Sequence, residues 1–339
     1  MKYVCNRCGE ITPELSKKPE KCPTCGVAQD ELTLINGEII PTIEPTPEQP
    51  KEPTTFGIQS NPSEIRRLLK LIVIPDGDTA YNGFQKTNLR LVDDKLLNFQ
   101  VAPAEAILTI LDLDRDYFKE TWKNGEIVLN STESLKKLKV LNAYDSVSIQ
   151  VDNENKVILH QAGDSAGFSD NLEDASHVIT SKAEMPVPFE YDTFKPKIDE
   201  DSPESEYKWH VTVDASSFAS LFEVTKNTGT EFFPFSLKGN EFSTGVGDMK
   251  NPGMEGAFFV NIPIIPEESI LPDAEIKVEV GPIFENVMKN ISGKVEIYFA
   301  GDELPLWILY RINKSVVEDD KTVEKTFGRM GYVIPPRSA

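Results

Sequence analysis

The hydrophobic and polar positions beyond about residue 57 follow two periods in turn, one typical of helices and one typical of strands. Four segments place apolar residues three and four positions apart, as Ile65, Leu68, Leu69 and Ile72 do, which predicts amphipathic helices. Each segment is followed by alternating apolar runs joined by a short polar turn, the pattern of a β-hairpin. The predicted helices span residues 61–74, 131–144, 214–228 and 281–292.

The order of these predicted elements repeats along the chain. Helix, hairpin, strand, helix and hairpin follow one another over about 61–160 and again over about 214–311. A repeat of this order at a spacing of about 130–150 residues indicates an internal duplication. The predicted fold class is therefore α+β, with two duplicated domains of helices and antiparallel sheets.

All four cysteines lie in the first 25 residues, as two C-x2-C pairs thirteen residues apart, and each pair is followed by glycine. Two such pairs form two tight knuckles and complete a tetrahedral shell of four sulfurs, which predicts structural zinc. Iron in a rubredoxin-like shell is the alternative, because the same knuckles hold either metal. Disulfides would need an oxidising compartment that the sequence gives no sign of entering. The predicted metal ligands are Cys5, Cys8, Cys22 and Cys25.

Two segments without periodicity separate the parts that are expected to fold. Prolines at 41, 45, 47, 50 and 53 favour an extended, semi-rigid spacer over helix or sheet. The acidic stretch MPVPFEYDTFKPKIDEDSPESE is typical of an exposed strap between two domains. The predicted parts are a zinc ribbon at 1–31, a tether at 32–56, a first domain at 57–185, a connector at 186–206 and a second domain at 207–339.

Charge is sorted by element in this acidic chain. Lys and Arg number 35 against 55 Asp and Glu, a net charge of −20. The predicted helices carry eight basic and five acidic residues, so they sum to +3 and the remainder to −23. One basic helix face is usually a solvated surface, but the same sorting across a duplicated fold favours helices that face a polyanion through phosphate contacts. The cations are Arg66, Arg67, Lys70, Lys136, Lys137, Lys139, Lys226 and Lys289.

Several function classes are not supported by the sequence. The amino-terminal residues lack the apolar core of a signal peptide, and no run approaches about 18 apolar residues, so neither secretion nor membrane spanning is expected. No G-x-x-x-x-G-K-[ST] loop is present, which argues against ATP hydrolysis. Residues 163–167 match G-x-S-x-G, but the acidic, poorly periodic stretch after them predicts a surface loop rather than a hydrolase elbow. The expectation is an intracellular protein, cytoplasmic or at the nucleoid or nucleus, that is not an enzyme.

Local stretches resemble the sliding clamps of the archaeal and eukaryotic type, the proliferating cell nuclear antigen family. The family's segment of strand, second inner helix and hairpin is similar to EIVLNSTESLKKLKVLNAYDSVSIQVDNE. Its exit from the connector into the third inner helix is similar to SPESEYKWHVTVDASSFASLF. Its carboxyl-terminal hairpin and final strand resemble VEIYFAGDELPLWILYRI and GRMGYVIPPR. The resemblance covers roughly residues 57–339.

This resemblance implies a ring. Two domains per subunit would place helices around a central hole and sheets outside, and a homotrimer would close the ring. Double-stranded DNA would be held topologically, without sequence specificity. The implied function is a processivity factor that tethers DNA polymerase and other replication and repair proteins and is opened by a clamp loader. The family's subunit contact joins two edge strands, here about residues 177–185 and 257–263.

Partner peptides in that family dock into an apolar pocket beside the connector and the terminus. The matching positions are Pro305, Val333, Ile334 and Pro335. The chain departs from the family in its connector, where the aligned stretch offers only Ile198 at the apolar pocket-lining positions and Val187 and Phe189 are the alternative candidates. It also departs at Pro335, where the family has alanine, and in a long loop with the sequence KSVVEDDKTVEKTF. The zinc ribbon and tether are additions to the usual clamp. The alternative function is a zinc-ribbon transcription or recruitment scaffold that does not encircle DNA.

Overall fold

A computed structural model of the chain contains two compact units, Met1–Lys51 and Glu52–Ala339. In the first unit, β1 (Lys2–Cys5) pairs in antiparallel fashion with β2 (Leu32–Ile35). The residues that the structure describes are 2–5, 21, 32–35, 56–81, 84–102, 107–121, 124–141, 146–151, 157–161, 169–171, 176–178, 207–228, 232–246, 258–301, 304–318 and 321–336.

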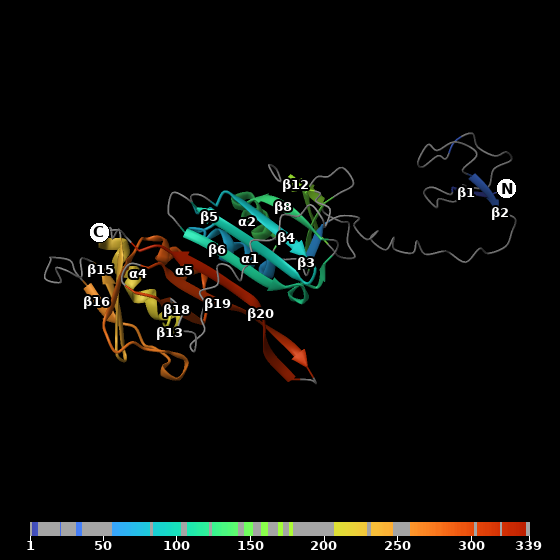
Figure 1. The fold of residues 1–339 in the computed structure, drawn as a ribbon. Helices are drawn as coiled ribbons and strands as arrows, with labels where there is room; N and C mark the ends of the chain where they lie inside the picture. The colour runs from blue at the N-terminus through green and yellow to red at the C-terminus, as the bar shows by residue number, and fades with distance from the viewer. Residues whose placement is uncertain are drawn as a thin grey trace. The chain divides into compact units, whose positions relative to one another are not determined.

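The second unit holds two similar sets of elements, which follow one another along the colour ramp of Figure 1. The first set is β3 (Gly57–Ser60), α1 (Pro62–Val73), β4 (Lys86–Val92), β5 (Lys95–Ala102), β6 (Ile107–Asp114), η2 (Arg115–Tyr117), β7 (Glu120–Thr121), β8 (Gly125–Asn130), α2 (Ser131–Val140), β9 (Val147–Val151), β10 (Val157–Gln161), β11 (Ser169–Asn171) and β12 (Ser176–Val178). The second set is β13 (Trp209–Asp214), η4 (Ala215–Phe218), α4 (Ala219–Thr228), β14 (Phe233–Lys238), β15 (Glu241–Val246), β16 (Phe258–Asn261), η5 (Pro266–Glu268), β17 (Ile276–Val280), α5 (Ile283–Asn290), β18 (Lys294–Phe299), β19 (Leu306–Glu318) and β20 (Lys321–Ile334).

The strand orders of the two sets correspond. In the first set, β8-β4-β5-β6 are neighbours in one sheet and β3-β9-β10-β11 are neighbours in another. In the second set, β17-β14-β15-β16 and β13-β18-β19-β20 repeat these two orders. This topology confirms the duplicated α+β architecture that the repeat of helices and hairpins predicts.

The two sets share one nine-stranded sheet, because β6 of the first set pairs with β20 of the second. The register runs from Gly328 opposite Leu113 to Val333 opposite Leu108. A Cβ atom on Gly328 would lie 2.2 Å from the carbonyl oxygen of Asp112, so only glycine allows this approach. The sheet therefore crosses the boundary between the two repeats without a break.

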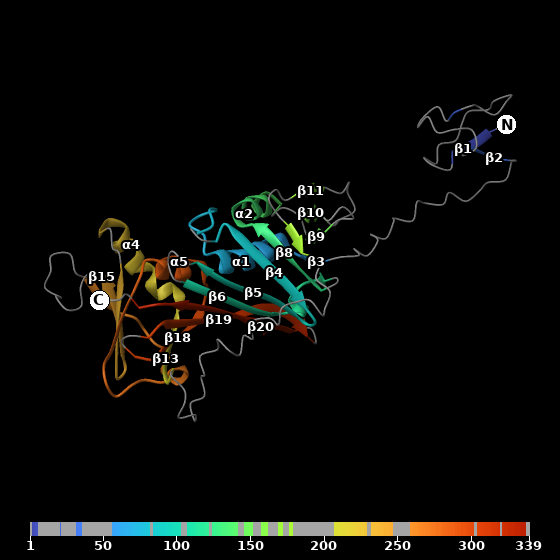
Figure 2. The same ribbon diagram turned by 45° about the horizontal axis from the view of Figure 1, so that its top comes forward.

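The four helices of the described residues form a layer on one side of the sheets, in the spatial order α2, α1, α5, α4 (Figure 2). α1 packs against both α2 and α5, and α5 packs against η4, which leads into α4. Asn61, Asn130 and Asp214 begin three of these helical segments by accepting a hydrogen bond from a backbone N–H two or three residues later. Such caps satisfy donors that would otherwise be unpaired at a helix start.

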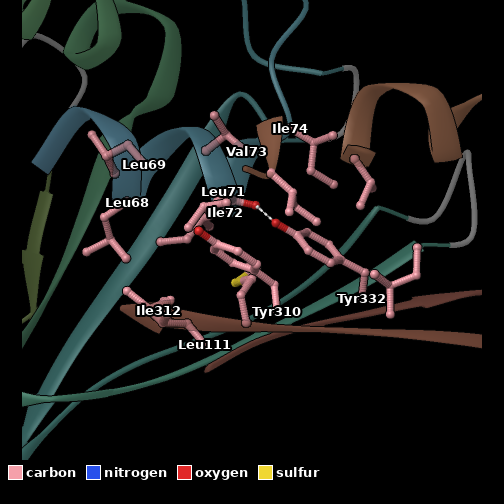
Figure 3. Close-up of a cluster of buried hydrophobic side chains, with 14 of the residues drawn as sticks. Leu68, Leu69, Leu71, Ile72, Val73, Ile74, Leu111, Tyr310, Ile312 and Tyr332 are labelled. Atoms are coloured by element: carbon pink, nitrogen blue, oxygen red, sulfur yellow. Dashed lines mark hydrogen bonds between the residues drawn. The ribbon is translucent and has the colours of Figure 1, made fainter. Parts of the chain in front are cut away.

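The core beneath α1 joins the two sets directly (Figure 3). The Tyr332 hydroxyl, on the last strand, donates a 2.8 Å hydrogen bond to the backbone carbonyl of Leu71 on the first helix. In a continuing helix this carbonyl would accept from residue 75, but residue 75 is proline and has no N–H. Burial raises the pKa of Tyr332 well above its ordinary value, so the hydroxyl stays protonated and able to donate.

We expect Tyr332→Phe to lower the free energy of unfolding by about 1–3 kcal/mol, because the buried Leu71 carbonyl loses its donor. Urea unfolding followed by circular dichroism measures this, with an unchanged slope against denaturant. A loss below about 0.3 kcal/mol would mean that the hydrogen bond contributes nothing net to stability.

One expectation differs from the structure. The stretch read as a long loop is a hairpin in which β19 and β20 extend beyond the sheet, and we call residues 313–318 and 321–326 the arm. Its many charged residues hide the β-branched Val316, Val317, Thr322 and Val323, which favour strands. β12, part of the segment expected to meet a neighbouring subunit, pairs with β8 and is the terminal strand of its sheet, so that subunit contact stays a prediction. None of the described helices is long and apolar enough to cross a membrane.

Candidate nucleic-acid interface

Three cations gather where α1 packs against α2. Arg66 and Lys70 lie one turn apart on α1, and Lys139 lies in the last turn of α2. Arg66 and Lys70 are half-buried and Lys139 is exposed. The apolar faces of both helices are buried, so these long side chains extend from the layer towards solvent. We call Arg66, Lys70 and Lys139 the cationic cluster.

Asp78 lies at the centre of the cationic cluster. One of its carboxylate oxygens is 2.6 Å from the Arg66 guanidinium, and the other is 2.5 Å from the Lys139 ammonium. A tight turn presents this side chain, with reciprocal backbone hydrogen bonds of 3.0 and 3.1 Å between Asp76 and Thr79. The turn is attached to α2, because the Ala80 N–H donates a 3.1 Å hydrogen bond to a hydroxyl at the start of that helix.

The pKa shifts of Lys70 and Asp78 show the direction in which these charges act on one another. Burial lowers the pKa of Lys70, and the positive charges of Arg66 and Lys139 lower it further. Hydrogen bonds from Lys139 and then Arg66 hold the pKa of Asp78 below its ordinary value. The cluster is therefore a concentration of positive charge of which one carboxylate neutralises a part.

The other cations predicted on the helices differ in their exposure and in their ion pairs. Lys136 is exposed on α2. Lys137 is 2.8 Å from Glu133 one turn earlier, and Lys289 forms the same kind of ion pair with Glu285. Lys226 belongs to α4, but its side chain is outside the described residues.

Arg67 is set apart from the other cations of α1. Its guanidinium donates to the Tyr310 hydroxyl and lies over the Tyr310 ring, 6.0 Å from the ring centroid. It also approaches the Asn313 carbonyl at 3.5 Å. Both partners belong to β19, so this side chain points towards that strand rather than into the cationic cluster.

A second apolar cluster covers the opposite face of the nine-stranded sheet, across the boundary between the repeats. Its buried members are Ile110, Tyr207, Tyr298, Trp307 and Leu309, with Phe99, Leu108, Ala300 and Val333 packed against them. We call this the outer cluster.

The predicted pocket residues are divided by this arrangement. Val333 packs against the outer cluster, and the half-buried Pro305 accepts a 3.0 Å hydrogen bond from the Tyr207 hydroxyl through its carbonyl. Ile334 is 1% exposed and belongs to the main core on the other face of the sheet. Pro335 is half-buried beside it. The residues 187, 189 and 198 lie outside the described residues.

Two groups at these sites were not predicted, although the sequence contains a feature that indicates each of them. Asp78 follows a basic helix within Pro75-Asp76-Gly77-Asp78, a turn sequence that places a carboxylate beside that helix. Trp307 and Leu309 alternate with Ile308 and Tyr310. A strand that is apolar on both faces predicts burial on both faces, which here means a second cluster opposite the helix layer.

The predicted metal ligands and the G-x-S-x-G segment fall largely outside the described residues. Cys5 ends β1, while Cys8, Cys22 and Cys25 are outside them, as are residues 163–167. The zinc site and the surface loop therefore stay predictions.

Several solved structures have the same arrangement of helices and sheets. A PCNA from Thermococcus kodakaraensis is 15% identical, with a TM-score of 0.58 over 84% of this chain and 100% of that one. The PCNA2–PCNA3 complex from Sulfolobus tokodaii gives 15% identity and a TM-score of 0.57 over 83% of this chain and 99% of that one. The chain has a PCNA-like clamp fold. A third match is the A. fulgidus PCNA bound to the C-terminal region of FEN-1, at 12% identity and a TM-score of 0.55 over 84% of this chain and 99% of that one.

The likeness to the PCNA structures extends over most of this chain. The known chains are matched over nearly their whole length, so both repeats and the shared sheet belong to the likeness. No family profile matches the sequence, and no curated protein does. At these identities the comparison establishes the fold, and the function must be argued from the site.

Proposed function

We propose that this protein is a DNA sliding clamp that closes as a homotrimer around duplex DNA and is not an enzyme. The observation that carries the proposal is the cationic cluster on a layer of four helices, in a chain whose net charge is −20. A concentrated patch of this kind attracts phosphates without reading sequence. An acidic remainder repels DNA, so contact is limited to the side that carries the cations.

The duplication itself supports ring closure. Within the chain, β6 of the first repeat pairs with β20 of the second. Their counterparts in the strand orders are β16 and β11, and among the described strands β16 pairs only with β15 and β11 only with β10. A β16 edge that meets β11 of the next copy would repeat the internal junction. Such a head-to-tail contact continues from copy to copy until the ring closes.

One of the two edge strands that the internal repeat assigns to the interface differs from the one expected from the resemblance. The expected segment began at residue 177, whereas the repeat points to Ser169–Asn171 (β11). The other side of the contact stays the same, since β16 lies within the expected residues 257–263. Oligomeric mass measured by light scattering tests the proposal: we expect three chains of 37.9 kDa each. A monomer would favour the recruitment scaffold.

A further prediction concerns the lysines of α2 on the helix layer. We expect changing Lys136, Lys137 and Lys139 together to Ala to weaken DNA retention while the trimer persists. Each phosphate contact contributes about 0.9 to the slope of log affinity against log salt, so the slope should fall by about 1 to 3. A matched control removes the exposed Lys238, Lys277 and Lys321 from the sheet side and the arm. Equal losses in both variants would contradict a localised DNA-facing surface.

The half-buried residues around the outer cluster, Phe99, Leu108, Ala300 and Val333, are proposed as the docking surface for polymerase and other partner peptides. The outer cluster joins both repeats on the face opposite the helix layer, so a partner held there would not compete with DNA. Val333 and the Pro305 backbone are the predicted pocket positions beside it. A known clamp of this fold has been seen bound to the C-terminal region of FEN-1, which supports this class of partner. A clamp loader is the further expected partner.

We also propose one structural zinc ion on the four cysteines. The pairing of β1, which ends at Cys5, with β2 supports this, because Cys8, Cys22 and Cys25 lie in the sequence between these two paired strands. About 30 residues cannot bury much core, so metal binding would supply much of the folding free energy. Metal analysis of the purified chain should give one zinc per chain. Iron would be recognised in the same measurement.

A further inference from the structure

β19 has a free edge. It pairs with β18 only from Trp307 to Leu309, opposite Tyr298 to Glu296. From Arg311 to Glu318 its only strand partner among the described residues is β20, on its other side. These eight residues span about 26 Å, at about 3.3 Å per residue. Every second residue of such an edge directs its backbone N–H and C=O away from the partner strand.

A cleft of about 740 Å³ runs along this edge, in the place that β18 would occupy if it continued. One wall holds Glu64 and Arg67 of α1, and the other holds Asp214 and Lys294 at the ends of β13 and β18. Residues of β19 from Leu309 to Ser315 form the floor. The volume lies within the range of ligand-binding clefts, about 300–1,000 Å³.

Charged side chains line both sides of the cleft, and several of them form ion pairs with one another. Three carboxylates are already matched there, since Lys314 is 2.8 Å from Glu64, Arg311 is 2.8 Å from Glu296, and Lys294 pairs with Glu268.

Three charged groups of the lining form no ion pair among the described residues, and one of them, Asp214, instead accepts hydrogen bonds from Ser216 at the start of the next helical segment. Among the described residues, no ion pair joins Arg67 to a carboxylate, and none joins Glu324 to a cation. Arg67 lies on the α1 side, and Glu324 is opposite Ser315 in the arm. Lys314, next to Ser315 in the strand, contacts Tyr117 and Glu64 on the α1 side, so Ser315 and Glu324 face the opposite side.

We propose that this cleft binds an extended peptide segment of a partner protein, which adds to the sheet as a strand against residues 311–318. A row of backbone donors and acceptors on a strand edge is complementary to another extended backbone. The unmatched charges define its side chains: a carboxylate on the face towards Arg67, and a lysine or arginine on the face towards Glu324. The cleft adjoins the outer cluster only at Leu309, and this site does not depend on ring formation.

The arm makes this edge accessible. Ser315, Val317 and Glu318 on β19 are exposed, and Val317 is 74% exposed. An isolated two-stranded hairpin is at best marginally stable in water, and a third strand stabilises it. The partner segment would supply that third strand.

The test uses the full chain and a defined probe. The probe is a fluorescent peptide of about eight residues, built from threonine and valine, with one glutamate and one lysine on opposite faces of the strand. Fluorescence anisotropy measures binding, and hydrogen exchange measures the amides of residues 311–318. We expect saturable binding below about 1 mM and slower exchange of those amides. A control peptide methylated on alternate backbone nitrogens loses donors and should not bind.

Glu324→Lys separates strand addition at this edge from binding elsewhere. Glu324 is exposed on the arm, so the change should leave the fold intact. It should weaken the probe about fivefold, and a probe whose lysine is replaced by glutamate should recover that loss.

The proposal would be overturned by no binding at about 1 mM, by binding that does not slow these amides, or by equal binding of the methylated peptide. It would also be overturned if exchange of residues 311–318 were already slow in the free protein and became fast on dilution, because a second copy would then occupy the edge.

Discussion

Asp78→Asn is expected to strengthen binding of duplex DNA by about tenfold at 0.1 M salt. Asp78 holds Arg66 and Lys139 at 2.6 and 2.5 Å, so it occupies the position that a phosphate oxygen would take. Removing its charge frees one or both cations for phosphate contact. Each added contact steepens the dependence of log affinity on log salt by about 0.9, or about eightfold in affinity between 1 M and 0.1 M salt.

Binding isotherms at four or five salt concentrations measure both the gain and the slope. Asp78→Glu retains the charge and should stay close to the original protein. Asp273→Asn removes one negative charge at an exposed position in the loop before β17, so it controls for net charge alone. If Asp273→Asn has the same effect as Asp78→Asn, DNA does not contact the cationic cluster.

Phe258→Lys is expected to convert the trimer into monomers at about micromolar concentration. Phe258 and Phe259 are 39% and 36% exposed on the edge strand β16, which we propose to meet β11 of the next copy. A charge placed in that contact costs about 2 kcal/mol or more per interface, or about 30-fold in affinity. Three equivalent interfaces in one ring multiply the effect.

Light scattering across a concentration series measures this change, and circular dichroism verifies that the monomer is folded. Phe258→Leu retains an apolar side chain and should remain trimeric. Asn261→Lys, at an exposed position of the same strand, is a second variant for the case in which Phe258→Lys does not fold. A trimer that persists in both lysine variants would show that β16 is not at the subunit contact.

Local signals in the sequence were enough to predict most elements of the fold. Asn61 followed by Pro62 is typical of a helix start, and Asn61 does cap α1. Asp93 and Asp94 are typical turn residues, and they do form the turn between β4 and β5, where Asp93 has a left-handed φ of 49°. These features depend on neighbours within a few residues. The repeat of helices and hairpins then predicted the duplicated domains.

Contacts between distant segments were not predictable in the same way. Arg66 and Lys70 lie on the exposed side of α1, but adjacent helical residues differ by about 100°, and nothing local indicated that Arg67 would face Tyr310 of β19. The place of Asp78 between two helices depends on how α1 packs against α2. The pairing of β6 with β20 joins residues more than 200 positions apart. Val333 and Ile334 lie on opposite faces because successive strand residues alternate, but that both faces are covered depends on this distant packing.

Retention on DNA of two topologies tests the central claim most directly. The protein is loaded onto a nicked circular plasmid, unbound protein is removed by gel filtration, and half of the sample is cut once with a restriction enzyme. A closed ring should stay on the circle and leave the linear DNA by sliding off its ends. Equal retention on circular and linear DNA would contradict the account, because protein that is held by local contacts does not respond to free ends.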